Sequence, residues 1–66
     1  MVAENAKRLI KEKGLKQKHV AALAGYDEKK FSAKLNGSSI IREKDIIRIA
    51  KALNVTPNEL YGIDSP

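Results

Sequence analysis

The sequence contains no cysteine, only two prolines and four glycines, and no long apolar run. Without cysteine, neither disulfides nor thiolate metal sites can hold the fold together. No apolar segment approaches the roughly 20 residues that span a bilayer, and the chain starts with a charged amphipathic segment rather than a signal peptide. The 66 residues predict a single domain, 1–66, that helix packing must stabilise. We expect a cytoplasmic protein with no cofactor, no metal, no membrane contact and no evident small-molecule ligand.

Groups that an enzyme would need are also scarce. The chain has one histidine, His19, which we expect on the exposed side of its helix, and it has no Gly-rich phosphate loop. Glu28 is isolated among lysines, and Asp45 has no potential metal ligand at helical spacing. We therefore expect that the protein is not an enzyme.

Positive charge is concentrated in most of the chain. Residues 1–51 hold all 13 basic residues and six acidic ones, a net charge of +7, whereas 52–66 carry −2. Clustered basic charge suits a polyanionic partner such as nucleic acid. The alternative is a Lys-rich surface that only maintains solubility, and charge alone does not decide between the two.

Apolar spacing and end signals predict an all-α fold with five helices. Stripes at helical spacing indicate helices over about 2–13, 17–24, 28–36 and 43–53. A fifth helix at 57–61 is indicated by a capping box, with Thr56 as N-cap, Pro57 at the first position and Glu59 at the third. Residues 63–66 are expected to fray.

Several apolar and charged side chains are given local roles by the same patterns. Leu23 is expected to widen the buried stripe of 17–24, and Ile40 and Ile41 to anchor the loop after 37. Ile47 is expected either to widen the core face of its helix or to lie on a second surface that meets a partner. An ion pair between Glu4 and Arg8 is expected from their spacing of four residues.

The stretch 17–37 is interpreted as two short helices joined by a tight turn. Gly25 would end the first helix at positive φ, and Asp27 would cap the second. The second helix has a narrow buried edge, Phe31 and Leu35, and its remaining surface is polar and rich in lysine. Since so short a helix is unlikely to be stable alone, its polar face is expected to have a binding role.

This segment resembles the helix-turn-helix of Cro, lambda-repressor and Xre-type regulators, with the approximate pattern T-Q-x-x-L-A-x-x-L-G-V-S-x-x-x-I-S-x-x-E-x-G. The residues in register with it are Gln17, Val20, Ala21, Gly25, Phe31, Ser32 and Gly37. The resemblance covers about 5–62 and implies a compact, five-helix lambda-repressor-like domain. Lys16 replaces the usual Thr, and Ala24 replaces a Leu. Leu35 replaces a Glu whose basic partner would be at Ile10, so a buried apolar contact is expected there instead of an ion pair.

The resemblance implies a sequence-specific regulator of transcription, a repressor of the phage or mobile-element kind, that binds double-stranded DNA. Its recognition helix, about 28–36, would read bases in the major groove with Glu28, Lys29, Ser32 and Ala33. Contacts to the DNA backbone would come from Lys16, Gln17, Lys30, Asn36, Ser38, Arg42 and Lys44, and from the backbone amides of the loop 37–39. Candidates for contacts in a homodimer on DNA are Tyr61 and Ile63.

Three alternatives remain open at this point. The protein is either such a regulator, an antitoxin that also grips a protein partner, or an interaction module that keeps the fold without reading DNA. Glu28 has a simpler alternative of its own, since an acid at a helix N-terminus stabilises the helix dipole without contacting a base.

Overall fold

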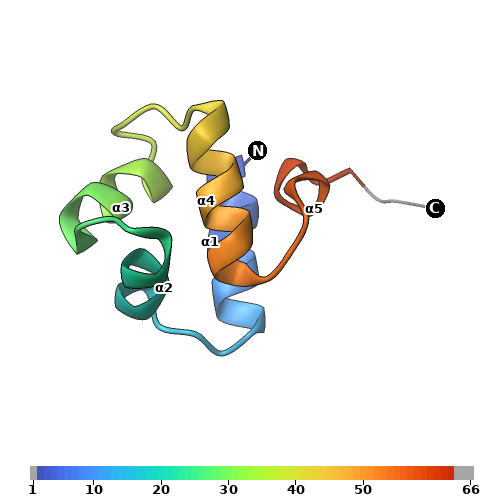
Figure 1. Ribbon diagram of the computed structural model, residues 1–66, viewed down its shortest axis with the longest axis horizontal. Helices are drawn as coiled ribbons and strands as arrows, with labels where there is room; N and C mark the ends of the chain where they lie inside the picture. Colours follow the sequence, from blue (N-terminus) through green and yellow to red (C-terminus); the bar gives the residue numbers. More distant parts are fainter. Residues whose placement is uncertain (1, 64–66) are drawn as a thin grey trace.

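The computed structural model describes residues 2–63, and within them the chain forms five α-helices and no strand (Figure 1). The helices are α1 (Val2–Glu12), α2 (Gln17–Ala24), α3 (Glu28–Leu35), α4 (Glu43–Leu53) and α5 (Pro57–Tyr61). The all-α, five-helix prediction is confirmed, and helix ends fall within one residue of their predicted places. Of the tail expected to fray, 64–66 lie outside the described residues, whereas the amide of Ile63 donates to the carbonyl of Asn58.

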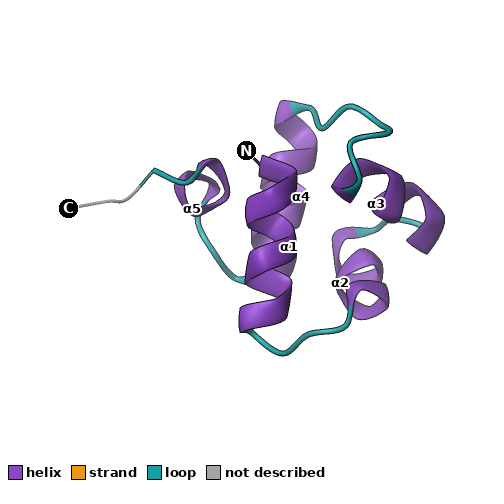
Figure 2. Cartoon of the chain, turned by 180° about the vertical axis from the view of Figure 1, so that it is seen from behind, coloured by secondary structure: helices purple, strands orange, loops and turns teal. Residues whose placement is uncertain are grey.

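Two helices form the centre of the molecule, and the other three pack on either side of them. Figures 1 and 2, which view the chain from opposite sides, both place α1 and α4 in the middle, with α2 and α3 on one side and α5 on the other. The packing agrees, since α2 contacts α4, α3 contacts α1 and α2, and α5 contacts α1 and α4. As a result, α3 and α5 lie towards opposite ends of the longest axis (Figure 1).

One apolar core joins all five helices. Its buried members are Ala6, Leu9, Ile10, Val20, Ala21, Phe31, Leu35, Ile46, Ile49, Ala50, Leu53 and Leu60. Ile10 and Leu35 both belong to it, as expected for an apolar replacement of an ion pair between α1 and α3. The small Ala21 lets α2 approach its neighbours closely, and the partly buried Leu15 packs on the core as the loop leaves α1. Burial of these stripes, rather than helix propensity, therefore stabilises helices as short as α2 and α3.

Local signals define the ends of the two helices in the turn region. Gly25 has φ of +80°, and its amide and that of Tyr26 bond back to the carbonyls of Ala22 and Ala21, which ends α2. The side chain of Asp27 accepts a hydrogen bond of 2.7 Å from the amide of Lys29, which caps α3. Position 16, the N-cap of α2, makes no such side-chain bond, as the Thr-to-Lys departure predicted.

The Thr56 half of the capping box predicted at the start of α5 is present. Its hydroxyl accepts a hydrogen bond of 3.3 Å from the amide of Glu59, and Pro57 starts the helix. Asn5 of α1 then donates 2.8 Å to the carbonyl of Leu60. This bond and the fully buried Leu60 attach α5 to the rest of the molecule.

Three apolar residues predicted to pack inward are exposed instead. Leu23 is 58% exposed, Ile40 is 69% exposed and Ile47 is 49% exposed. Leu23 and Ile47 each lie about 110° around their helices from the centre of the buried face, outside the stripe that the core can cover. In the 37–42 loop, Ile41 packs against the core, whereas the neighbouring Ile40 does not. Ile47 therefore lies outside the core face of its helix, and its contact with a partner stays a prediction.

The predicted pair of Glu4 and Arg8 is also wrong. Among the described residues, Arg8 pairs with Glu12 at 3.0 Å, one turn further along α1. Both side chains are exposed, so the exchange alters stability by only a few tenths of a kcal/mol.

None of the helices within 2–63 combines the length and apolar character needed to cross a bilayer.

Candidate nucleic-acid interface

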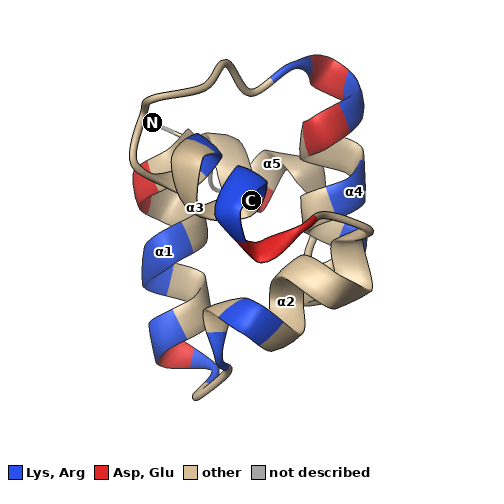
Figure 3. Cartoon of the chain, turned by 90° about the vertical axis from the view of Figure 1, so that its left-hand side faces the viewer, with Lys and Arg blue, Asp and Glu red and all other residues tan. Residues whose placement is uncertain are grey.

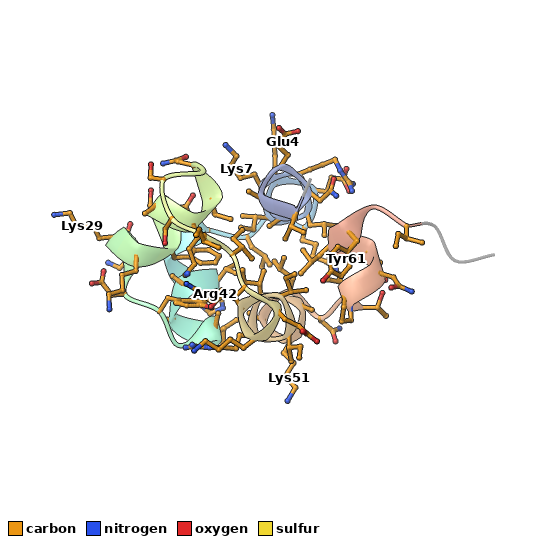
Figure 4. All side chains as sticks on the ribbon, turned by 90° about the horizontal axis from the view of Figure 1, so that it is seen from above. Glu4, Lys7, Lys29, Arg42, Lys51 and Tyr61 are labelled. Carbon is orange, nitrogen blue, oxygen red and sulfur yellow. The ribbon has the colours of Figure 1, made fainter. Side chains whose placement is uncertain are left out.

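The residues predicted to read bases lie together on the outer side of α3. Glu28 and Lys29 are exposed on its first turn, and Ser32 and Ala33 are half-buried on the next. Phe31 and Leu35 hold the opposite side of the helix in the core. Figure 4 shows Lys29 extending away from the body of the molecule. The outer side of α3 is thus presented to solvent on a firmly packed helix.

Basic residues surround this helix. Figure 3 views the α3 end directly and shows Lys and Arg on α3 itself, on α1 and α2 beside it and at the start of α4. A negatively charged duplex approaching from this end would meet basic groups on four helices. Acidic residues also lie there, at the start of α3 and in the first turn of α4.

The residues predicted to contact the DNA backbone fall into two groups on either side of α3. Lys16 is exposed and Gln17 half-buried at the start of α2. On the other side, Lys30, Asn36, Ser38, Arg42 and Lys44 are all exposed on α3, on the following loop and at the start of α4. Within the second group, Asn36 donates 3.3 Å to the hydroxyl of Ser32, which links a predicted backbone contact to a predicted reading residue.

The prediction that loop amides at 37–39 would meet a phosphate is wrong. The amide of Gly37 donates to the carbonyl of Lys34 at 3.3 Å, and those of Ser38 and Ser39 donate to the carbonyl of Ala33 at 2.9 and 3.2 Å. All three amides therefore satisfy carbonyls at the end of α3, which otherwise have no intrahelical partners. The loop can offer DNA its side chains but not these donors.

Sequence reasoning missed a cluster of four polar residues behind α3, Tyr26, Lys34, Asp45 and Arg48, called here the polar cluster. Asp45 is 3% exposed and accepts hydrogen bonds from the hydroxyl of Tyr26, from the amide of Arg42 at 2.9 Å and from Lys34 at 3.2 Å. Lys34 also donates 3.0 Å to the carbonyl of Ile40 in the following loop.

Arg48 completes the polar cluster from the second turn of α4. Its guanidinium donates to the carbonyls of Ala24 at 2.9 Å and Gly25 at 2.8 Å, where α2 ends. The guanidinium also lies 4.2 Å from the centre of the Tyr26 ring. That ring in turn stacks on the ring of Phe31, which belongs to the core. The polar cluster thus joins the end of α2, the turn, α3, the loop and α4.

The protonation states of the polar cluster follow from its geometry. Burial would raise the pKa of Asp45, but the hydrogen bonds from Tyr26, the Arg42 amide and Lys34 outweigh it and lower that pKa to about 2. Burial, followed by the bond to Asp45, raises the pKa of Tyr26 to about 12. At neutral pH the carboxylate is charged and the hydroxyl neutral, so each bond has its donor and its acceptor.

Sequence offered little warning of this arrangement. The spacing suggested only that Asp45 stands alone, whereas the structure brings Asp45 and Lys34 together as a largely buried ion pair. Their separation of 11 residues crosses a loop, and Tyr26 and Asp45 are 19 residues apart. The one available signal is a carboxylate at the third position of α4, where side chains often accept from the N-cap amide.

Comparison with protein families matches residues 6–65 to the Cro/C1-type HTH DNA-binding domain. The chain belongs to this family. Cro/C1-type domains bind DNA, serve in transcriptional regulation and are not enzymes, and here α2 and α3 form the helix-turn-helix. Comparisons with curated proteins and with solved structures give no significant match.

Two further predicted features of this Cro/C1-type domain concern the α5 end and α2. Tyr61 and Ile63, the homodimer candidates, are 47% and 56% exposed at the α5 end of the molecule. His19 is exposed on α2. Within residues 2–63, no three His, Cys, Asp or Glu side chains converge in a way that could hold a metal ion.

Proposed function

We propose that the protein is a sequence-specific transcriptional regulator, a repressor of the phage or mobile-element kind, that reads operator DNA with α3 in the major groove. The observation that carries this proposal is the outer side of α3, which is polar, exposed and mounted on a buried edge within a Cro/C1-type domain. We propose the cytoplasm as its site of action, and the support is the proposed DNA target.

The proposed base contacts come from four residues of α3. Lys29 would donate to N7 and O6 of guanine, and Glu28 would accept from N4 of cytosine. The methyl group of Ala33 suits the methyl group of thymine, and the Ser32 hydroxyl pairs with several bases. Each contact that forms should contribute roughly 1–3 kcal/mol of discrimination between bases.

The proposed backbone contacts flank α3 and carry no sequence information. They comprise Lys16 and Gln17 on one side and Lys30, Asn36, Ser38, Arg42 and Lys44 on the other. If about five phosphates are neutralised per protomer, the logarithm of the binding constant should fall with the logarithm of salt concentration with a slope of about −4 to −5.

We propose that the protein acts as a homodimer on a two-fold operator. The support is the exposed pair Tyr61, the last residue of α5, and Ile63, just after it, at the end of the molecule away from α3. A two-fold axis at that end would leave both α3 helices free, with half-sites about one helical turn apart. Sedimentation of the free protein and of Ile63→Ser tests this, with Ile40→Ser, an exposed isoleucine at the other end, as the matched control.

Selection from a randomised pool of duplex DNA at near-physiological salt tests the function itself. We expect an enriched two-fold motif for the wild-type protein and a relaxed motif for Lys29→Ala combined with Ser32→Ala. Lys51→Ala, which removes an exposed lysine of α4 that points away from α3 (Figure 4), should keep the motif. Retention of the full motif by the double variant would refute base reading by α3, and an absence of any enrichment would refute the proposed function.

A further inference from the structure

The apolar attachment of α3 to the rest of the molecule runs along a single edge. Phe31 and Leu35, the two buried residues of this eight-residue helix, are four positions apart and therefore lie one above the other on the same face. Two side chains on one line fix the position of a helix, but by themselves they do not prevent its rotation about that line. Such a rotation would turn the outer side of α3 away from its present direction. Groups that prevent it must lie off the buried edge.

Two polar attachments lie off this edge and reach the same carboxylate. Lys34 lies about 80° around α3 from the buried edge, and its ammonium is 3.2 Å from Oδ2 of Asp45. Tyr26 comes two residues before α3 begins, and its hydroxyl donates to Oδ1 of Asp45. The carboxylate is therefore bound once from each end of α3.

Asp45 is itself fixed to α4, one of the two central helices (Figure 1). It is the third residue of that helix, and its Oδ2 accepts a hydrogen bond of 2.9 Å from the amide of Arg42 at the helix start. Asp45 is only 3% exposed, so water does not compete for these bonds. The carboxylate thus gives α3 a fixed point of reference on the central pair of helices.

Lys34 differs from the other lysines of α3 in where its charge is used. Lys29 and Lys30 are exposed, whereas the side chain of Lys34 is only 15% exposed. Its ammonium binds Asp45 and also donates 3.0 Å to the carbonyl of Ile40 in the following loop. The charge of Lys34 is therefore compensated inside the protein, and it attaches α3 to both the loop and α4.

We infer that Asp45, Lys34 and Tyr26 are positioning residues that determine how specifically α3 reads bases, although none of them touches DNA. Together they fix the rotation of α3 relative to α4, and with it the direction of the four proposed base-reading residues. Hydrogen bonds to base edges weaken steeply when the donor is misaligned, so a fixed rotation favours discrimination. This inference rests on the proposed function, because it concerns how base reading by α3 becomes precise.

Variants that remove one attachment each test the inference with DNA. Lys34→Met keeps an unbranched apolar side chain without the charge, and Tyr26→Phe keeps the ring that stacks on Phe31 and removes only the hydroxyl. For each variant, we compare the dissociation constant for a mixed-sequence duplex with that for the selected operator. The ratio of the two should fall about fivefold or more, which is the discrimination of one base contact. Affinity for the mixed-sequence duplex should stay nearly unchanged, because phosphate contacts carry it.

A matched control separates positioning from a general loss of stability. Ile49→Val removes one methyl group from the buried face of α4 and lowers stability without altering the polar cluster. Measured, like the other variants, at a temperature where circular dichroism shows the protein folded, it should keep the wild-type ratio. The inference is overturned by an unchanged ratio for both Lys34→Met and Tyr26→Phe, or by an equally large loss for Ile49→Val.

Salt dependence distinguishes a positioning role of Lys34 from a direct contact with DNA. Lys34→Met should leave the slope of the log–log salt plot unchanged, because Lys34 neutralises Asp45 and not a phosphate. Lys30→Met, at an exposed lysine one turn earlier in α3, is the comparison and should lower the magnitude of the slope by about 0.9. A decrease of about 0.9 for Lys34→Met would place its ammonium on the DNA and overturn its positioning role.

Residual dipolar couplings of backbone amides measure the orientation of α3 without DNA. In the wild-type protein, the couplings of α3 and α4 should fit a single alignment. In Lys34→Met and Tyr26→Phe, the couplings of α3 should shrink or require another orientation, while α1 and α4 still fit together. Couplings of α3 that keep the wild-type orientation in both variants would overturn the inference. If the wild-type protein shows no base preference, the proposed function fails, yet the couplings still decide whether these attachments fix the rotation of α3.

Discussion

Replacement of the buried carboxylate of Asp45 by an amide tests the polar cluster most directly. This carboxylate has a pKa of about 2 in the folded protein against an ordinary value of 3.8. The difference corresponds to about 2 kcal/mol of folding free energy at neutral pH. Because the pKa is lower in the folded state, this stability is present above about pH 4 and is lost as the pH falls from about 4 to about 2.

For Asp45→Asn we expect two separable effects on the free energy of unfolding. At pH 7 the variant leaves the largely buried Lys34 ammonium without its counter-ion, and we expect a loss of about 2–3 kcal/mol. This loss is smaller than that for a fully broken buried pair, because Lys34 keeps its bond to the Ile40 carbonyl. Between about pH 4 and about pH 2, the variant should lose about 2 kcal/mol less than the wild-type protein. A chain of this size has only about 3–10 kcal/mol in total, so both effects are large.

Urea unfolding followed by circular dichroism at several values between about pH 7 and about pH 2 measures both effects. Glu43→Gln is the control, since Glu43 is an exposed carboxylate two residues earlier in α4 and has no part in the polar cluster. It should leave the pH dependence as in the wild-type protein. Parallel stability curves for Asp45→Asn and wild type below pH 4 would refute the assigned hydrogen bonds, and equal stability at pH 7 would refute the buried ion pair.

Three further predictions concern the ends of the helices. Arg48→Met keeps an apolar stem over the Tyr26 ring but removes the donors to the carbonyls at the end of α2. Urea unfolding should therefore show a free energy of unfolding lower by about 1–2 kcal/mol, whereas the control Lys51→Met should leave it nearly unchanged. Gly25→Ala should cost about 2 kcal/mol in the same assay. The residue has a φ of +80°, and the added Cβ would lie 2.7 Å from Nη2 of Arg48. Gly14→Ala, at φ +67° with open space around it, should cost only about 1 kcal/mol, and equal losses would exclude the contact as a cause. Thr56→Ala should lower the melting temperature through a lost cap of about 1 kcal/mol, and an unchanged melting temperature would contradict that role.

Features that depend only on residues close to one another along the chain were predictable from the sequence. Helical spacing located four of the helices, because a buried stripe must recur with the period of the helix, and the capping residues around Thr56 located the fifth. Gly25, Asp27 and Thr56 were correctly assigned to helix ends, because capping involves only bonds across a few residues. The exposure of Glu28 and Lys29 on the outer side of α3 also followed from periodicity, while their contacts with DNA stay predictions.

Features that depend on the placement of the surrounding helices were not predictable from the sequence. Leu23 and Ile47 lie at the edge of their apolar stripes, and only the placement of the surrounding helices decided that they remain exposed. Likewise, the loop amides at 37–39 looked free because the sequence does not reveal that α3 ends with its carbonyls turned towards them.

The sequence by itself determined five helices and a basic surface, because period, caps and charge are all local properties, and its resemblance to the Cro/C1-type pattern indicated the DNA-binding family. Only the tertiary structure decided which polar residues act together. Tyr26, Lys34, Asp45 and Arg48 come from the turn, α3 and α4, and each would be an ordinary surface residue on an isolated helix. Packing of α4 against α2 and beside α3 removes Asp45 and most of Lys34 from water, and a buried charge must then find a partner.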